Sequence, residues 1–529
     1  MATAPAPPPK KLHGRAFYES IGSPKFVVAP MVDQSEFAWR MLTRSLMPES
    51  SRSQLLAYTP MLHARLFSSD PKYRQAHFQA TRDGKAWLDG NASLGDRPLF
   101  VQFCANDATT LLEAAQRVAP YCDAVDLNLG CPQGIARKGR YGAFLQEDQH
   151  LIFQLVNRLH RELSIPVTAK IRILDTKEET LAYAQNVLKA GASILTVHGR
   201  RREQKGHLTG VADWDVLRFL RRHLPAETVI FANGNVLQFA DLHRCLRETG
   251  ADAVMSAEGN LSDPAIFAGI PLPVHDVDDD DGGAGREFWR GRVESHGAGW
   301  RVDALMRRYL DILYLYALET TPPHRQPLFI PSDDKSNLKP FLSTTTANPP
   351  PSKRRKTTCS CSSSSLASSP NLSAIQPHLF HLLRHLISRH TDVRDMLVRV
   401  SRNGGLDGYE DLLSAVEEKV GLGLMEYEES DGKCFDEEID ALPLPVDDND
   451  VDLVVSSSSS SSAATVRRCR RPWWVAQPII RPLPAEALAK GAITMSKKTK
   501  GASRGAAAAA AAAAAVAVVD AVADGSTGC

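Results

Sequence analysis

Short apolar runs alternate with amphipathic stretches between about residues 24 and 272. Eight runs have the length of buried strands, and they lie near 26–29, 55–58, 99–103, 124–129, 167–171, 194–197, 229–232 and 253–255. Apolar residues at helical spacing predict helices at 35–46, 109–119, 142–162, 176–190, 213–224 and 236–248. Eight strands joined by helical crossovers predict an α/β fold, a (β/α)8 TIM barrel. A doubly wound sheet is the alternative, but no Gly-x-Gly-x-x-Gly follows the first strand.

The same pattern divides the whole chain into six segments. Residues 1–23 are predicted to be disordered, 24–275 to form the barrel domain, and 276–319 to be an acidic loop and the first part of a helical domain. Helical spacing runs from 286 to 318 and returns over 373–428, after a Pro/Ser/Thr-rich insert at 320–372 that is expected to be disordered. The low-complexity tail at 429–529 is not expected to form a domain of its own. Its basic and aromatic segment, 467–484, is interpreted as a linker rather than as a segment that docks onto the body.

Composition and charge indicate a soluble protein of a reducing compartment. The nine cysteines include no Cys-x-x-Cys spacing, which favours an intracellular location (cytoplasm, nucleus or both) and gives no metal motif. The N-terminus lacks the apolar core of a signal peptide, and the longest apolar run, 506–519, is too short to span a bilayer, so no membrane partner is expected. The net charge of +1 means that any nucleic-acid surface must be local.

Polar side chains cluster at the predicted carboxyl ends of the strands. These ends carry Asp126, Asn128 and Cys131; Lys170 and Arg172; His198 and Arg200; Asn233, Gly234 and Asn235; and Ala257 with Glu258. Each has a structural alternative, since Cys131 could be a core thiol, His198 a core imidazole and Lys170 a snorkelling side chain. Carboxyl ends meet at one mouth of a barrel, however, so a ligand site explains the set better.

The order of these groups fits flavin mononucleotide (FMN). Barrels of this kind commonly bind phosphate at the loops after strands seven and eight, here 233–235 and 257–259. Lys170 could stabilise negative charge on a reduced ring, and Gln102 could hydrogen-bond the ring edge.

The motifs resemble the tRNA-dihydrouridine synthases, in particular the eukaryotic branch that acts on D-loop uridines at tRNA positions 16 and 17. The matching stretches are 28–35, 57–63, 126–133, 169–172, 197–200, 233–235 and 255–260. The resemblance covers residues 20–272 well, and 286–318 and 373–410 less specifically. It implies an FMN-dependent oxidoreductase that reduces uridine in tRNA to 5,6-dihydrouridine with NADPH or NADH.

The resemblance also implies roles for single residues. Those that would bind FMN are Pro30, Met31, Val32, Gln102, Lys170, His198, Asn233, Gly234, Asn235, Ala257 and Glu258. Cys131 would be the general acid that protonates uracil C5 after hydride transfer to C6; a thiol of pKa about 8.5 is protonated at neutral pH. Asn128, Arg172 and Arg200 would bind the substrate. Many bacterial relatives carry Gly-Arg in place of Ala257-Glu258, so backbone N–H groups would serve the phosphate here.

The partners implied are tRNA and a nicotinamide nucleotide, and we expect a monomer. Between residues 286 and 407 there are 18 Lys/Arg and 10 Asp/Glu, a local excess that favours phosphate contacts. Residues 353–356, Lys-Arg-Arg-Lys, could be a nuclear localisation signal, a tRNA contact or a solvated run. Two other functions stay open. The first is an FMN barrel that acts on a free pyrimidine, and the basic region argues against it. The second is a tRNA-binding chaperone with an inactive flavin site, and the presence of Cys131, Lys170 and His198 argues against it.

Overall fold

Eight parallel strands form a closed barrel in this computed structural model, which describes residues 11–206, 209–269, 284–293, 296–338, 369–403, 406–441, 467 and 469–479. The strands are β1 (Phe26–Val28), β2 (Leu55–Tyr58), β6 (Leu99–Cys104), β7 (Ala124–Leu129), β8 (Val167–Arg172), β9 (Ile194–His198), β10 (Val229–Asn233) and β11 (Ala253–Ser256). Each pairs with its neighbours in parallel, and the β2–β6 pairing closes the ring; β3 (Leu62–His63) adds to β6. The predicted TIM barrel is confirmed, and every predicted strand ends within one residue of the observed one.

Helices surround the barrel because the strands are apolar on both faces and need cover outside. They are α2 (Phe37–Leu46), α3 (Ala64–Ser69), α4 (Pro71–His77), α5 (Ala108–Val118), α6 (Gly134–Gly139), α7 (Gln149–Glu162), α8 (Lys177–Lys189), α9 (Trp214–His223), α10 (Phe239–Thr249) and α11 (Glu258–Ser262). The helix predicted at 142–162 begins later than expected. Gly142 has a φ of +66°, and the carboxylate of Asp148 caps α7 by accepting from Leu151 N–H, so only a 3-10 turn precedes it.

A short helix, α1 (Gly14–Ser20), covers the amino-terminal end of the barrel, so the prediction of disorder over 1–23 is wrong for this part. Phe17 and Tyr18 are buried, and Phe17 stacks on Phe100 with ring centroids 5.9 Å apart. Tyr18 Oη donates to the carbonyls of Pro24 and Asp252. The interior of the barrel is therefore plugged at this end and can hold a ligand only at the other.

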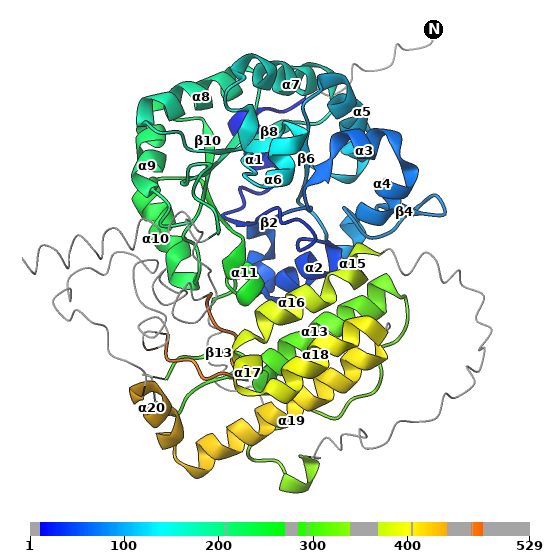
Figure 1. Ribbon diagram of the computed structural model, residues 1–529, viewed down its shortest axis with the longest axis vertical. Helices are drawn as coiled ribbons and strands as arrows, with labels where there is room; N and C mark the ends of the chain where they lie inside the picture. The colour runs from blue at the N-terminus through cyan, green and yellow to red at the C-terminus, as the bar shows by residue number, and fades with distance from the viewer. Residues whose placement is uncertain are drawn as a thin grey trace, which may run out of the picture.

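The helical domain lies below the barrel in Figure 1. Its elements are α12 (Ala284–Glu287), β12 (Phe288–Trp289), β13 (Gly299–Trp300), α13 (Val302–Ile312), α15 (Pro370–Ser373), α16 (Ile375–Leu382), α17 (Arg384–Arg389), α18 (Thr391–Asn403), α19 (Asp407–Glu429) and α20 (Lys433–Asp440). The helix predicted over 286–318 is wrong over 288–301, because β12 and β13 pair as an antiparallel hairpin there. Gly291 and Gly299 fit there only without a Cβ, which would lie within 2.6 Å of His296 and Val475.

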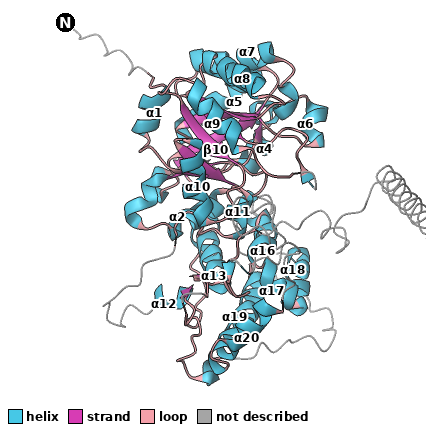
Figure 2. Cartoon of the chain, turned by 90° about the vertical axis from the view of Figure 1, so that its left-hand side faces the viewer, coloured by secondary structure: helices cyan, strands magenta, loops and turns pink. Residues whose placement is uncertain are grey.

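Helices α2 and α11 of the barrel share a hydrophobic core with the helical domain. At its centre Glu36 is buried, caps α2 by accepting from Trp39 N–H, and lies 3.0 Å from Nε2 of buried His378 on α16. The imidazole of His378 stacks on Trp39 with centroids 3.9 Å apart. A buried hydrogen bond beside a stacked ring fixes both position and angle, so the two domains form a single packed unit (Figure 2).

The tail and the insert differ from prediction where they are described. Residues 469–479 dock onto the helical domain instead of forming a linker, because Trp473 and Trp474 are buried there. Trp474 O accepts from Val302 N–H, and Gly423 on α19 leaves room for both indoles. The insert begins with ordered chain, in which Arg325 bridges Asp311 and Glu410. Residues 339–368, including the basic run at 353–356, and the polyserine and polyalanine runs lie outside the described residues.

In the described part of the chain, no helix is both long and apolar enough to cross a membrane.

We predict that Trp474→Ala lowers the free energy of unfolding by about 3–5 kcal/mol, because it opens a cavity among Trp289, Tyr427 and Trp473. Chemical denaturation followed by circular dichroism measures the change. Leu422→Ala, at a side chain 48% exposed on α19, is the matched control and should change stability by less than about 0.5 kcal/mol. Equal effects of the two substitutions would mean that the tail does not support the domain.

Candidate active site

A chain of hydrogen bonds runs through the interior of the barrel towards its mouth. Thr168 Oγ1 and Gln102 Nε2 donate to the two carboxylate oxygens of Asp126, at 2.6 and 2.8 Å. Asn128 Nδ2 then donates to Gln102 Oε1 at 2.8 Å. Strand pairing brings these groups together, because Gln102 and Thr168 both lie in register with Asp126.

This chain, which we call the Asp126 relay, ends on the loop that carries Cys131. Asn128 Oδ1 accepts from the backbone N–H groups of Gly130 and Cys131, at 3.0 and 2.9 Å. An ionised carboxylate can only accept, so Asp126 fixes which way the Gln102 amide is turned, and Gln102 in turn fixes Asn128. The backbone at Cys131 is therefore positioned from inside the barrel.

The carboxyl of Asp126 is the unusual group in this relay. Burial raises its pKa to about 6, against the hydrogen bonds of Thr168 and Gln102 and the charge of Lys170. The group is thus ionised at neutral pH at some cost in stability. Gln102 and Asn128 were predicted to contact flavin and substrate; both are buried and bonded to each other, which favours a positioning role for them.

Cys131 lies half-buried between β7 and α6, in contact with Cys104 and Tyr141. Gly142 permits this packing, because a Cβ there would lie 2.8 Å from the Cys131 carbonyl oxygen. Burial raises the pKa of Cys104 and of Tyr141, each to about 12. Both neighbours therefore stay protonated at neutral pH and place no negative charge beside Cys131.

Lys170 follows Thr168 on the inner face of β8 and lies in register with Asn128. Burial, together with the charge of Arg172, lowers its pKa to about 8. Its ammonium forms no hydrogen bond with any other residue that the structure describes. A cation without a hydrogen-bond partner is thus held in the barrel mouth, available to a bound group.

A cavity opens between the carboxyl ends of β8, β9, β10 and β11. It encloses about 690 Å³ of space, a volume that includes part of the open solvent at its mouth. The predicted site residues that line it are Arg172, His198, Arg200, Asn233, Gly234, Asn235, Ala257 and Glu258. The structure therefore brings these eight together.

The loop after β10 is shaped by residues that accept a left-handed backbone. Gly234 has a φ of +110°, and a Cβ there would lie 2.6 Å from Ala212 and 3.0 Å from the His198 ring. Asn235, with a φ of +59°, accepts from Arg200 Nη2 at 2.6 Å and so ties two loops together. Glycine is therefore needed for the close packing of this loop against Ala212 and His198.

Arg200 is only 3% exposed and acts within the protein. Besides Asn235, its guanidinium donates to Gly210 O and lies 3.0 Å from His198 Nε2. A guanidinium only donates, so His198 Nε2 is the acceptor in this contact. These contacts favour a role in orienting His198 over the predicted contact of Arg200 with substrate.

Two further cations hold the loops around Cys131. Arg172 Nε donates to Gly130 O at 2.7 Å, and its Nη1 donates to Arg201 O at 2.9 Å. Lys205 Nζ donates to Pro132 O at 2.6 Å. The loop after β9 is thereby tied to the cysteine loop across the mouth of the cavity.

The loop after β1 contains Pro30, Met31 and Val32 and does not line this cavity. Hydrogen bonds to Ser35 hold this loop in place. Ser35 Oγ accepts from Met31 N–H, and Ser35 O accepts from Arg40 Nη1 at 2.8 Å.

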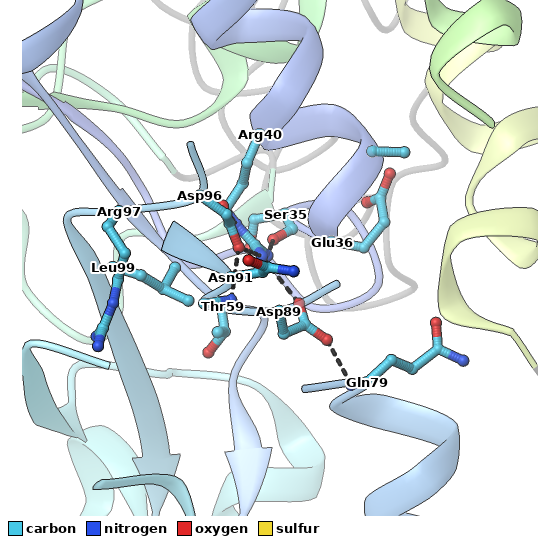
Figure 3. Close-up of polar contacts among 12 residues, drawn as sticks. Ser35, Glu36, Arg40, Thr59, Gln79, Asp89, Asn91, Asp96, Arg97 and Leu99 are labelled. Atoms are coloured by element: carbon cyan, nitrogen blue, oxygen red, sulfur yellow. Dashed lines mark hydrogen bonds and ion pairs between the residues drawn. The ribbon is translucent and has the colours of Figure 1, made fainter. Parts of the chain in front are cut away.

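Figure 3 shows the side chain of Arg40 between two carboxylates. Its guanidinium is fully buried, donates twice to Asp96 and lies 2.8 Å from Asp89. Asp89 also accepts from Gln79 N–H, and Gln79 Oε1 accepts from Asn371 of the helical domain. The β1 loop is therefore linked through buried polar contacts to the second domain.

Some predicted residues lie apart from the cavity, and others that line it were not predicted. Cys131, Asn128, Gln102 and Lys170 belong to the neighbouring part of the mouth, at β6, β7 and β8. The lining residues missed by sequence reasoning are Pro132, Gln133, Gln204, Lys205, Gly206, Thr209, Val236, Leu237 and Met255. For the loop after β9, the Arg-Glu-Gln motif at 202–204 was the signal in the sequence. In the described residues no three His, Cys, Asp or Glu side chains could together hold a metal ion.

Comparison with known proteins agrees with this geometry. Residues 27–279 match the family model described as Dihydrouridine synthase (Dus). A Schizosaccharomyces pombe protein named tRNA-dihydrouridine(16/17) synthase [NAD(P)(+)] is 40% identical over 486 residues, which cover 91% of this chain and 94% of that protein. A Saccharomyces cerevisiae protein of the same name is 57% identical, over 49% of this chain and 57% of its own length. A human protein named tRNA-dihydrouridine(20a/20b) synthase [NAD(P)+]-like is 35% identical, over 46% of this chain and 70% of its own length.

A polar barrel mouth, a cysteine on a fixed loop and a joined helical domain fit the oxidoreductase class that these relatives define. This chain belongs to the dihydrouridine synthase family.

We predict that Arg40→Leu lowers the free energy of unfolding by about 3–5 kcal/mol, because it leaves Asp89 and Asp96 buried without a counter-ion. Thermal and urea unfolding measure the loss. Adding Asp89→Asn and Asp96→Asn should recover part of it, since the unpaired charges are then removed. A loss below about 1 kcal/mol in the single variant would contradict the assigned role.

We predict that stability depends on pH through Asp126. Its folded pKa, about 6, lies above the ordinary value of 3.8, so protonation favours the folded state. This stability is present below about pH 4 and is lost as the pH rises through about 6, a change of about 3 kcal/mol. The free energy of unfolding of the wild type minus that of Asp126→Asn should fall by that amount between about pH 4 and pH 7. If this difference in free energy does not change with pH, the pKa of the Asp126 carboxyl is not raised.

Proposed function

We propose that this protein is a tRNA-dihydrouridine synthase that reduces uridines 16 and 17 of the tRNA D-loop to 5,6-dihydrouridine, with NADPH or NADH as reductant and FMN as bound cofactor. The observation that carries the proposal is Cys131, fixed by the Asp126 relay beside a cavity at the mouth of the barrel. The names of the fungal relatives support the same positions, and the match to the S. pombe protein extends over nearly the whole of both chains.

The residues of the mouth suit FMN. The loop at 233–235 and the start of α11 at Glu258 line the cavity together with Lys205. These loops and Lys205 would hold the phosphate, while Lys170 would face the ring. When bound, FMN supplies the two-electron reduction of the uracil C5–C6 bond.

Cys131 supplies the proton that this reduction requires at uracil C5. Its loop is held by Asn128 on one side and by Arg172 and Lys205 on the other, so the thiol has a fixed place. Protonated Cys104 and Tyr141 surround it and leave no nearby anion to take its proton. General acid catalysis from a fixed donor is typically worth about 10²–10⁴ in rate.

A uridine reaches this mouth only after it leaves its stack. Moving a base out of a helical stack costs a few kcal/mol. The cost is smallest for a base in a loop, so uridines of the D-loop are suitable substrates. The helical domain, rigidly joined to the barrel by Glu36 and His378, would hold the rest of the tRNA during this step.

We also propose an intracellular monomer. The six described cysteines are free thiols, which supports a reducing compartment.

Cys131→Ala tests the proposal. We expect the variant to keep its flavin, seen by absorbance near about 450 nm, and to form dihydrouridine in tRNA at least about 100-fold more slowly. Cys434→Ala, at a half-buried cysteine of the helical domain, is the control and should react at the wild-type rate. Unchanged turnover of Cys131→Ala would exclude the acid role, and a wild-type protein without flavin bands would favour a chaperone.

A further inference from the structure

Helix α6 forms the rim between the cavity and the outer surface. Pro132 and Gln133, which precede it, line the cavity. One face of α6 is anchored: Ala136 is buried, and its carbonyl accepts from Tyr141 N–H at 3.1 Å. Asn106 Nδ2 donates to Gly139 O at 3.0 Å and holds the end of the helix. The backbone of α6 is therefore fixed in position next to Cys131.

The other face of α6 carries an exposed apolar side chain. Ile135 is 68% exposed, more than any other large hydrophobic residue in the described part of the chain. Burial of such a side chain against a partner is favourable, and the described residues around it do not provide that burial. Ile135 stands four residues after Cys131, at the edge of the site where a uridine would enter.

Three cations surround Ile135. Arg137, Lys138 and Arg140 are exposed, and none of them forms a hydrogen bond or ion pair with another described residue through its side chain. Arg140 has a φ of +50°, which turns the chain back towards Tyr141 and Cys131. Such a cluster attracts phosphates without first giving up a protein partner.

The cations of the helical domain differ from this cluster, because most of them are paired. Arg307 is bound to Glu417, Arg325 to Glu410 and Arg389 to Glu438. The basic excess counted in the sequence is thus reduced by acids beyond residue 407. Figure 2 shows α6 on the same side of the molecule as α16 and α18, so one RNA could contact both domains.

We propose that α6 is the element that holds the D-loop open: Ile135 enters the RNA as an apolar wedge and packs against the base next to the extruded uridine, while Arg137, Lys138 and Arg140 bind the flanking phosphates. The inference rests on the proposed function. An apolar side chain that fills the space left in the stack lowers the cost of keeping the nucleotide out. The three cations position the RNA backbone. Because α6 is anchored, the distance between the wedge and Cys131 is fixed.

Single-turnover kinetics of the full-length flavoprotein test the wedge. The enzyme is reduced with NADPH, mixed with tRNA, and the return of flavin absorbance is followed. Ile135→Ala should slow this reaction about 50-fold, the effect of losing three buried methyl or methylene groups. Flavin content and oxidation by ferricyanide should stay unchanged, and Ile135→Leu should restore the rate. Leu12→Ala, at a side chain 47% exposed beside α1 at the opposite end of the barrel, is the control.

Salt dependence of tRNA binding tests the cations. Arg137→Gln with Lys138→Gln should weaken binding and lower the slope of log affinity against log salt by about 1.4, the value for two lost phosphate contacts. Ile135→Ala should leave that slope unchanged. The inference is overturned if Ile135→Ala reacts like Leu12→Ala, or if the double variant keeps the wild-type slope. Failure of the wild type itself to reduce tRNA would instead overturn the proposed function.

Discussion

The ionised carboxylate of Asp126, buried inside a barrel of apolar strands, is the constraint on which the site depends. Because it accepts and never donates, it turns Gln102, then Asn128, and finally fixes the N–H groups of Gly130 and Cys131. A buried charge is costly, and burial raises its pKa accordingly. In return, hydrogen bonds from the interior of the barrel hold the loop that carries Cys131 in one conformation.

Around that centre the structure uses cations in two ways. Arg40, Arg172 and Arg200 are buried and fully used in tying loops together. Lys170, Arg137, Lys138 and Arg140 form no side-chain hydrogen bond with another described residue, and the proposals above assign them to flavin and to RNA.

The barrel could be predicted well from the sequence, since strands buried on both faces are recognised from short apolar runs alone. The mouth could be located too, because packing alone does not require polar side chains at the ends of so many apolar strands. The bond between Gln102 and Asn128 could not be predicted, since it depends on the register of β6 and β7. Three further features could not be predicted either: the plug formed by α1, the hairpin within 286–301, and the docking of Trp473 and Trp474 onto the helical domain. Each of those contacts joins residues far apart in the chain, and local spacing carries no information on such pairs.

The most direct measurement of the central claim is a map of dihydrouridine in tRNA from cells that lack this protein. The account predicts that dihydrouridine disappears at positions 16 and 17 and persists at other D-loop positions. It further predicts that the wild-type gene restores both positions. Unchanged dihydrouridine at 16 and 17 would contradict it.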